Sequence, residues 1–108
     1  MGQCDDFLTE CCLFIDTGQI HYLSNRKKNK DTLNLLQYSI PAMLQEIKEL
    51  IGGDLYKGPV PDSDSKYPGD VWVFKKVIKG YPIYIKLKNK DFGDDGRLLL
   101  IMSFHIDE

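Results

Sequence analysis

The chain has 108 residues, of which 43% are hydrophobic and 28% charged, and its formal net charge is −2. This length and balance fit one globular domain, residues 1–108, and exclude a disordered chain. The longest apolar runs fall far short of the ~20 residues of a membrane helix, and acidic residues interrupt the N-terminal segment where a secretory signal would be apolar. We therefore expect a cytoplasmic protein, and the net charge alone argues against a generally basic nucleic-acid binder.

Three cysteines, Cys4, Cys11 and Cys12, lie close together near the N-terminus. Their number is odd and two are adjacent, which argues against a disulfide framework. Both histidines, His21 and His105, are distant in sequence and there is no Cys-x-x-Cys pair, which argues against a zinc site. We expect reduced thiols on a packed helix.

Apolar residues recur at helical spacing in the first element. They are Phe7, Leu8, Cys11, Cys12 and Ile15. The pattern predicts a helix that ends near Thr17 and Gly18, because glycine accepts a left-handed cap. Residues 19–23 then alternate in polarity, which predicts a short strand with His21 at its surface.

Residues 24–30 (SNRKKNK) carry four cations in seven positions. Such a run is typical of a solvated loop, and the alternative is contact with RNA phosphates or an acidic partner. We expect Asp31 to cap a short helix that continues through Tyr38.

A second short helix is predicted after Ser39, which can cap it, with Pro41 in the first turn where no N–H is needed. We expect this helix to end at Gly52 and Gly53. Its predicted core stripe is Met43, Leu44, Ile47, Leu50 and Ile51.

The second half of the chain has a different pattern. Residues 54–69 are rich in proline and glycine, which predicts a loop of defined shape. Residues 71–78, 82–88 and 98–106 are predicted strands, with a turn at Lys79 and Gly80. The predicted class is therefore α+β, with N-terminal helices packed on one face of a small antiparallel sheet, the 19–23 segment as a possible extra strand, and the other face open.

Strand alternation predicts what the open face carries. It places Tyr84, Lys86 and Lys88 together, pointing away from the core. In the last strand it divides the residues into two sets: Leu98, Leu100, Met102, Phe104 and Ile106 on one face, and Leu99, Ile101, Ser103 and His105 on the other. If these strands are neighbours, Tyr84, Lys86 and His105 share a surface with loop residues Tyr56 and Lys57. A phenol, ammonium groups and an imidazole together suit phosphate chemistry.

The local charge differs from the total. Residues 57–90 contain eight lysines and three acids, an excess of five positive charges, with aromatic residues between them. This pattern fits a single-stranded RNA surface, but by itself it is a weak signal, because a solvated sheet, especially at its edges, more often carries outward lysines. The carboxylates at Asp62, at Asp64 and in residues 91–96 (DFGDDG) indicate turns more simply than a metal site.

Several motifs follow one another in the C-terminal half. They are Tyr-Lys-Gly-Pro-x-Pro-Asp at 56–62, Gly-Asp-x-Trp-x-Phe at 69–74, Ile-Tyr-Ile-Lys-Leu-Lys at 83–88 and Ser-Phe-His at 103–105. In this order and spacing they resemble the MqsR family, toxins of bacterial type II toxin–antitoxin systems.

The resemblance implies a RelE-like α+β fold and a metal-independent endoribonuclease that cleaves mRNA without the ribosome or a cofactor. It implies single-stranded mRNA as the substrate and a cognate antitoxin protein as the partner, with no membrane and with DNA binding only through the antitoxin complex. The alternative is a non-catalytic module that binds single-stranded RNA or a protein.

Carried over residue by residue, the resemblance matches Lys57 and Tyr84 to positions implicated in catalysis. His105 occupies a basic C-terminal position that is lysine in the family's best-known member. We expect these three to be catalytic, with His105 as general acid or base, Tyr84 orienting or donating, and Lys57 as an alternative base. The residues expected to bind RNA are Tyr56, Lys86 and Lys88.

Overall fold

Three helices and five strands are present in the computed structural model, which describes residues 2–61, 69–91 and 97–107. The helices are α1 (Gln3–Asp16), α2 (Lys27–Leu36) and α3 (Ile40–Lys48), and a short 3-10 helix spans Gly52–Asp54. The strands are β1 (Ile20–Tyr22), β2 (Leu55–Pro61), β3 (Asp70–Ile78), β4 (Tyr81–Asp91) and β5 (Arg97–Ile106). The expected α+β class is confirmed.

The strands form one sheet in the order β1-β5-β4-β3-β2. β1 runs parallel to β5 while all the other neighbours are antiparallel, so the expectation of a purely antiparallel sheet is wrong. β1 and β5 are separated by most of the chain, so no hairpin forces them to run in opposite directions. The extra strand expected near residues 19–23 is confirmed.

β2 corrects the loop expected over residues 54–69, because its strand occupies Leu55–Pro61. The prolines that predicted a loop are compatible with this position, since β2 lies at the edge of the sheet and one side of an edge strand needs no partner. Residues 62–68 lie outside the described part.

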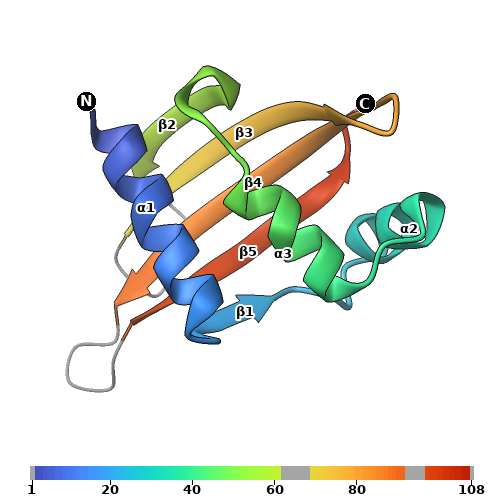
Figure 1. Ribbon diagram of the computed structural model, residues 1–108, viewed down its shortest axis with the longest axis horizontal. Coiled ribbons are helices and arrows are strands. Elements are labelled where there is room, and N and C mark those ends of the chain that lie inside the picture. The colour runs from blue at the N-terminus through green and yellow to red at the C-terminus, as the bar shows by residue number, and fades with distance from the viewer. Residues whose placement is uncertain (1, 62–68, 92–96, 108) are drawn as a thin grey trace.

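α1 and α3 lie side by side across one face of the sheet (Figure 1). The helical spacing of apolar residues in α1 buries Phe7, Leu8, Cys11 and Phe14. The Phe7 ring stacks on Trp72 of β3, with centroids 4.6 Å apart and planes at 12°. Strand residues that complete this core are Phe74, Ile78, Ile83, Ile85, Leu87, Leu99, Ile101 and Phe104.

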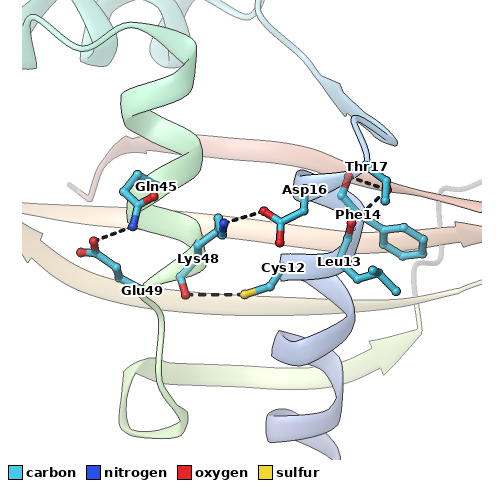
Figure 2. Close-up of polar contacts among 8 residues, drawn as sticks. All are labelled: Cys12, Leu13, Phe14, Asp16, Thr17, Gln45, Lys48 and Glu49. Carbon is cyan, nitrogen blue, oxygen red and sulfur yellow. Dashed lines mark hydrogen bonds and ion pairs between the residues drawn. The ribbon is translucent and has the colours of Figure 1, made fainter.

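Polar contacts fasten α1 to α3 (Figure 2). The Lys48 ammonium donates to the Asp16 carboxylate, and the Cys12 thiol donates to the Lys48 carbonyl at 3.6 Å. All three cysteines are free, as expected, and burial raises the pKa of Cys11. A fully buried thiol with a raised pKa is an unreactive packing group.

α3 begins as predicted, with the Ser39 hydroxyl accepting from the Ala42 N–H at 3.2 Å. It ends at Lys48, four residues before the expected glycine pair. Ile51 consequently falls outside the helix and is 64% exposed, so its place in the predicted core stripe is wrong.

The basic run of residues 24–30 was expected to be a loop, with a helix beginning only at Asp31. Instead α2 starts at Lys27, so this run is partly helical. The helix packs along the part of β5 that extends beyond the three residues of β1 (Figure 1). Asn29 of α2 is fully buried there. Its side-chain Nδ2 donates to the Met102 carbonyl at 3.2 Å, and its Oδ1 accepts from the Phe104 N–H at 3.0 Å. The side chain thus makes the hydrogen bonds that a neighbouring strand would make.

A bulge at Met102 corrects the faces predicted for the last strand. The register with β4 passes from Ser103 opposite Lys86 to Ile101 opposite Leu87, so Met102 is skipped. One extra residue inverts the alternation beyond it. Leu99 and Ile101 therefore face α1 and α3 together with Phe104, whereas Leu100 lies on the face of Ser103 and His105.

Candidate functional site

The face of the sheet turned away from α1 and α3 carries two rows of paired residues. In one row Lys75 of β3 lies opposite Tyr84 of β4, and Tyr84 lies opposite His105 of β5. Directly paired residues point to the same face. The second row consists of Lys57, Val73, Lys86 and Ser103. The expectation that Tyr84, Lys86 and His105 share one face is confirmed.

Tyr84 and His105 stack across the strands, with ring centroids 5.3 Å apart and planes at 16°. The His105 Nδ1 atom lies 2.9 Å from the Ile106 carbonyl oxygen. A carbonyl only accepts, so this hydrogen bond requires the proton on Nδ1. In the neutral ring the free lone pair is then on Nε2, and Nε2 is the atom that can act as a general base.

Lys75 also belongs to this site, although it was not among the residues expected from the sequence. Its ammonium lies 3.8 Å from the centroid of the Tyr56 ring and 3.1 Å from an Asp107 carboxylate oxygen. The hydrogen bond with Asp107 raises the pKa of Lys75, which keeps it cationic at neutral pH. The alternation in residues 71–78 contained the signal, because it places Lys75 on the same face as Val71 and Val73.

Lys57 lies on the same face but far from the imidazole. Its partner is Val73, so β3 and β4 separate it from β5. Three strand spacings amount to about 14 Å of backbone distance. The next residue, Gly58, has φ +121°, and a Cβ there would lie 2.6 Å from the Val71 carbonyl oxygen. The motif glycine therefore permits the close approach of β2 to β3 beside Lys57.

The two lysines of β4 that were expected to bind RNA differ in exposure. Lys86 is half-buried and lies diagonal to His105, through its pairing with Ser103. Lys88 lies on the same face but is fully buried. Gly69 packs closely over it, since a Cβ at Gly69 would lie 3.1 Å from the Lys88 Cε atom. Of these two side chains, only Lys86 is accessible to a ligand in this conformation.

The lysines of residues 57–90 do not form one patch. Lys76 pairs with Glu46 of α3 at 3.1 Å, and Lys79 donates to the Leu36 carbonyl at 2.7 Å, so both serve the helix-covered side. The Lys66 residue and the Lys90 side chain lie outside the described part. Among the described residues, the basic surface on the face turned away from α1 and α3 is therefore narrower than the sequence count indicates. Val71, Val73, Lys88, Leu100 and Ser103 on this face are buried, so the expectation of an open face is only partly confirmed.

The other candidates from the sequence are His21 and two groups of carboxylates. His21 is exposed, and Asp62, Asp64 and residues 92–96 lie outside the described part. Across residues 2–61, 69–91 and 97–107, no group of three or more His, Cys, Asp or Glu side chains is arranged to hold a metal ion. Over the same residues, no helix is long and apolar enough to cross a membrane.

No protein-family model, curated protein or solved structure matches the chain.

Proposed function

We propose that the chain is a metal-independent and ribosome-independent endoribonuclease that cleaves single-stranded mRNA. The observation that carries this proposal is the stacked pair of Tyr84 and His105, with Lys75 and Lys86 beside it on one face of the sheet. An imidazole, a phenol and ammonium groups supply a base, a proton donor and charge stabilisation for phosphodiester cleavage.

In the proposed reaction, the RNA 2′-hydroxyl attacks the adjacent phosphorus and the bond to the 5′-oxygen breaks. His105 Nε2 takes the 2′ proton, because Nδ1 is held by the Ile106 carbonyl. The Tyr84 hydroxyl donates a proton to the leaving oxygen. The products are a 2′,3′-cyclic phosphate and a free 5′-hydroxyl.

The cations take different parts according to their distance from the imidazole. Lys86 lies diagonal to His105 and stabilises the charge that develops on the phosphoryl oxygens. Lys57, three strands away, binds a more distant phosphate of the same RNA strand, with Tyr56 stacking on a base. This assignment makes Lys57 a binding residue rather than the alternative base.

The motif resemblance extends the proposal to the biological role. The chain is then the toxin of a type II toxin–antitoxin pair, with an MqsR-like, RelE-like fold, acting in the cytoplasm on mRNA and neutralised by its antitoxin. The α+β class, with α1 and α3 on one face of a single sheet, supports this part of the proposal.

The test is cleavage of purified RNA by the wild type, Lys57→Ala and His105→Ala. We expect His105→Ala to lower kcat by about 10²–10⁴-fold, because it removes the proton acceptor. Lys57→Ala should chiefly raise KM. A wild-type kcat for His105→Ala, together with a wild-type KM for Lys57→Ala, would overturn the site. Absence of cleavage by the wild type, together with RNA binding, would favour the non-catalytic module.

A further inference from the structure

A small pocket opens beside His105, between α2 and the end of β5. Its volume is about 120 Å³. The lining residues are Lys28, Asp31, Thr32, Leu35, His105 and Ile106. Pockets for whole drug-sized ligands are about 300–1,000 Å³. This pocket therefore fits one part of a larger ligand, such as a single phosphate group of a nucleic-acid strand.

Hydrogen bonds hold α2, which forms one side of the pocket, in a fixed position relative to the His105 imidazole. The Thr32 hydroxyl accepts from the Ile106 N–H at 3.0 Å, one residue beyond His105. The same helix is held by Asn29, which bonds β5 at Met102 and Phe104. Side chains on this side of α2 consequently keep a defined position beside His105.

The charges at the pocket favour an anion. Lys28 is exposed, and among the described residues it makes no ion pair. Asp31 is paired with Lys27 at 2.6 Å, which offsets its negative charge. The first turn of α2 contains no acidic residue. The positive end of the helix therefore adds to the potential of the lysines.

We propose that this pocket is a phosphate subsite for the RNA strand. Lys28 binds the phosphate next to the one that is cleaved at His105. This subsite rests on the proposed function. It directs the RNA strand from Tyr56 and Lys57 across the sheet to the first turn of α2. The contact is to the backbone, so it carries no sequence preference.

Lys30 supplies a matched control on the same helix. It is also an exposed lysine, but it lines a different pocket together with Tyr22 and Tyr38. Lys28→Gln and Lys30→Gln remove the same charge from opposite sides of α2. Any effect of total charge or helix propensity is therefore shared by the two variants.

The experiment measures binding of a short 2′-O-methyl oligoribonucleotide as a function of salt, with cleavage of ordinary RNA measured in parallel. The methylated probe has no free 2′-hydroxyl and cannot react. Lys28→Gln should weaken binding about fivefold and reduce the slope of log affinity against log salt by about 0.7, the value for one phosphate of a single strand. Lys30→Gln should leave the slope unchanged, and Asp31→Asn should strengthen binding.

Equal salt slopes for Lys28→Gln and Lys30→Gln, with a wild type that binds and cleaves RNA, would overturn the subsite and leave the proposed function intact. A wild type that neither binds the probe nor cleaves RNA would overturn both. Retained circular dichroism in each variant verifies that α2 is folded.

Discussion

Two aromatic rings on adjacent strands position the proposed chemistry. Tyr84 and His105 occupy directly paired positions, where Cβ atoms are about 4.5–5.5 Å apart, and their rings stack. The Ile106 carbonyl fixes Nδ1 of the imidazole. The ring orientation and the tautomer of His105 are thus both set before any substrate binds, as an efficient general base requires.

The first prediction tests the role of the Tyr84 hydroxyl while the aromatic ring is kept. Tyr84→Phe keeps the stack on His105 but removes the proton donor, so we expect kcat for RNA cleavage to fall about 10²-fold with little change in KM. Tyr81→Phe is the control, because Tyr81 lies on the other face of β4 and is 40% exposed. A Tyr84→Phe variant with wild-type kcat would show that the hydroxyl is not the donor.

At the level of single residues, the sequence predicted the shared face of Tyr84, Lys86 and His105 because period-two alternation is regular in β4 and in the part of β5 that follows the Met102 bulge. It did not identify Lys75, whose importance comes from its pairing with Tyr84 and its contact with Tyr56. Nor did it indicate that Lys88 is buried. Pairing between strands and packing over a side chain depend on tertiary structure, which a single strand pattern does not contain.

Among the secondary-structure elements, α2 acts as the cover of an open sheet edge. β1 has only three residues, so β5 would otherwise expose unpaired backbone groups beyond it. Asn29 and Thr32 satisfy these groups with side-chain hydrogen bonds to Met102, Phe104 and Ile106. The fully buried amide of Asn29 also donates to the Leu23 carbonyl at 3.0 Å.

The second prediction concerns this cover. Asn29→Ala leaves backbone partners on β5 unsatisfied in a buried place, so we expect the free energy of unfolding to fall by about 2–4 kcal/mol. Urea denaturation measures the change. Asn34→Ala, at an exposed position of the same helix, should change stability by less than about 0.5 kcal/mol. Equal stabilities for the two variants would contradict the role assigned to Asn29.

The sequence predicted most elements but missed features that arise from pairing. The helix α1 with its buried Phe7, Leu8 and Cys11, the Ser39 cap and the turn at Lys79 follow from local chemistry, and the structure confirms them. Cys12 of the predicted stripe is only partly buried, and Phe14, outside the stripe, is buried. The β2 strand was missed because prolines at a sheet edge resemble a loop. The bulge at Met102 was missed because a single inserted residue leaves no mark in an apolar run.

In the molecule as a whole, a partly buried network joins the helices to the sheet. The Tyr38 hydroxyl donates to one Glu46 oxygen at 2.5 Å, and Lys76 of β3 pairs with the other at 3.1 Å. Burial alone would raise the pKa of Glu46, but these hydrogen bonds lower it below its ordinary value. The hydrogen bond with Glu46 raises the pKa of Tyr38 to about 12.

The third prediction is a pH dependence of stability. Because the pKa of Glu46 is lower in the folded state, its contribution is present above the unfolded value of about 4.3 and is lost as pH falls through the folded value. Glu46→Gln should therefore lower the free energy of unfolding by about 1 kcal/mol at pH 7, and this difference should shrink below about pH 4. Urea denaturation across pH measures it, with Glu49→Gln as the exposed control. A difference independent of pH would contradict this account.

The net charge of −2 conceals an uneven distribution. Lys57, Lys75 and Lys86 lie on the face turned away from α1 and α3, whereas Lys76 and Lys79 bind groups on the helix side. An acidic protein can thus present a narrow basic face. The local excess in residues 57–90 overstated this face, because the sequence count cannot separate the two sides of a strand.

The central claim is that this face cleaves RNA through the 2′-hydroxyl. The most direct measurement is the chemistry of the product ends after purified wild-type protein acts on single-stranded RNA in the presence of EDTA. Our account predicts 2′,3′-cyclic phosphate and 5′-hydroxyl ends, and no cleavage of an RNA that carries 2′-O-methyl groups. Products with 5′-phosphate ends, or activity that EDTA abolishes, would contradict it.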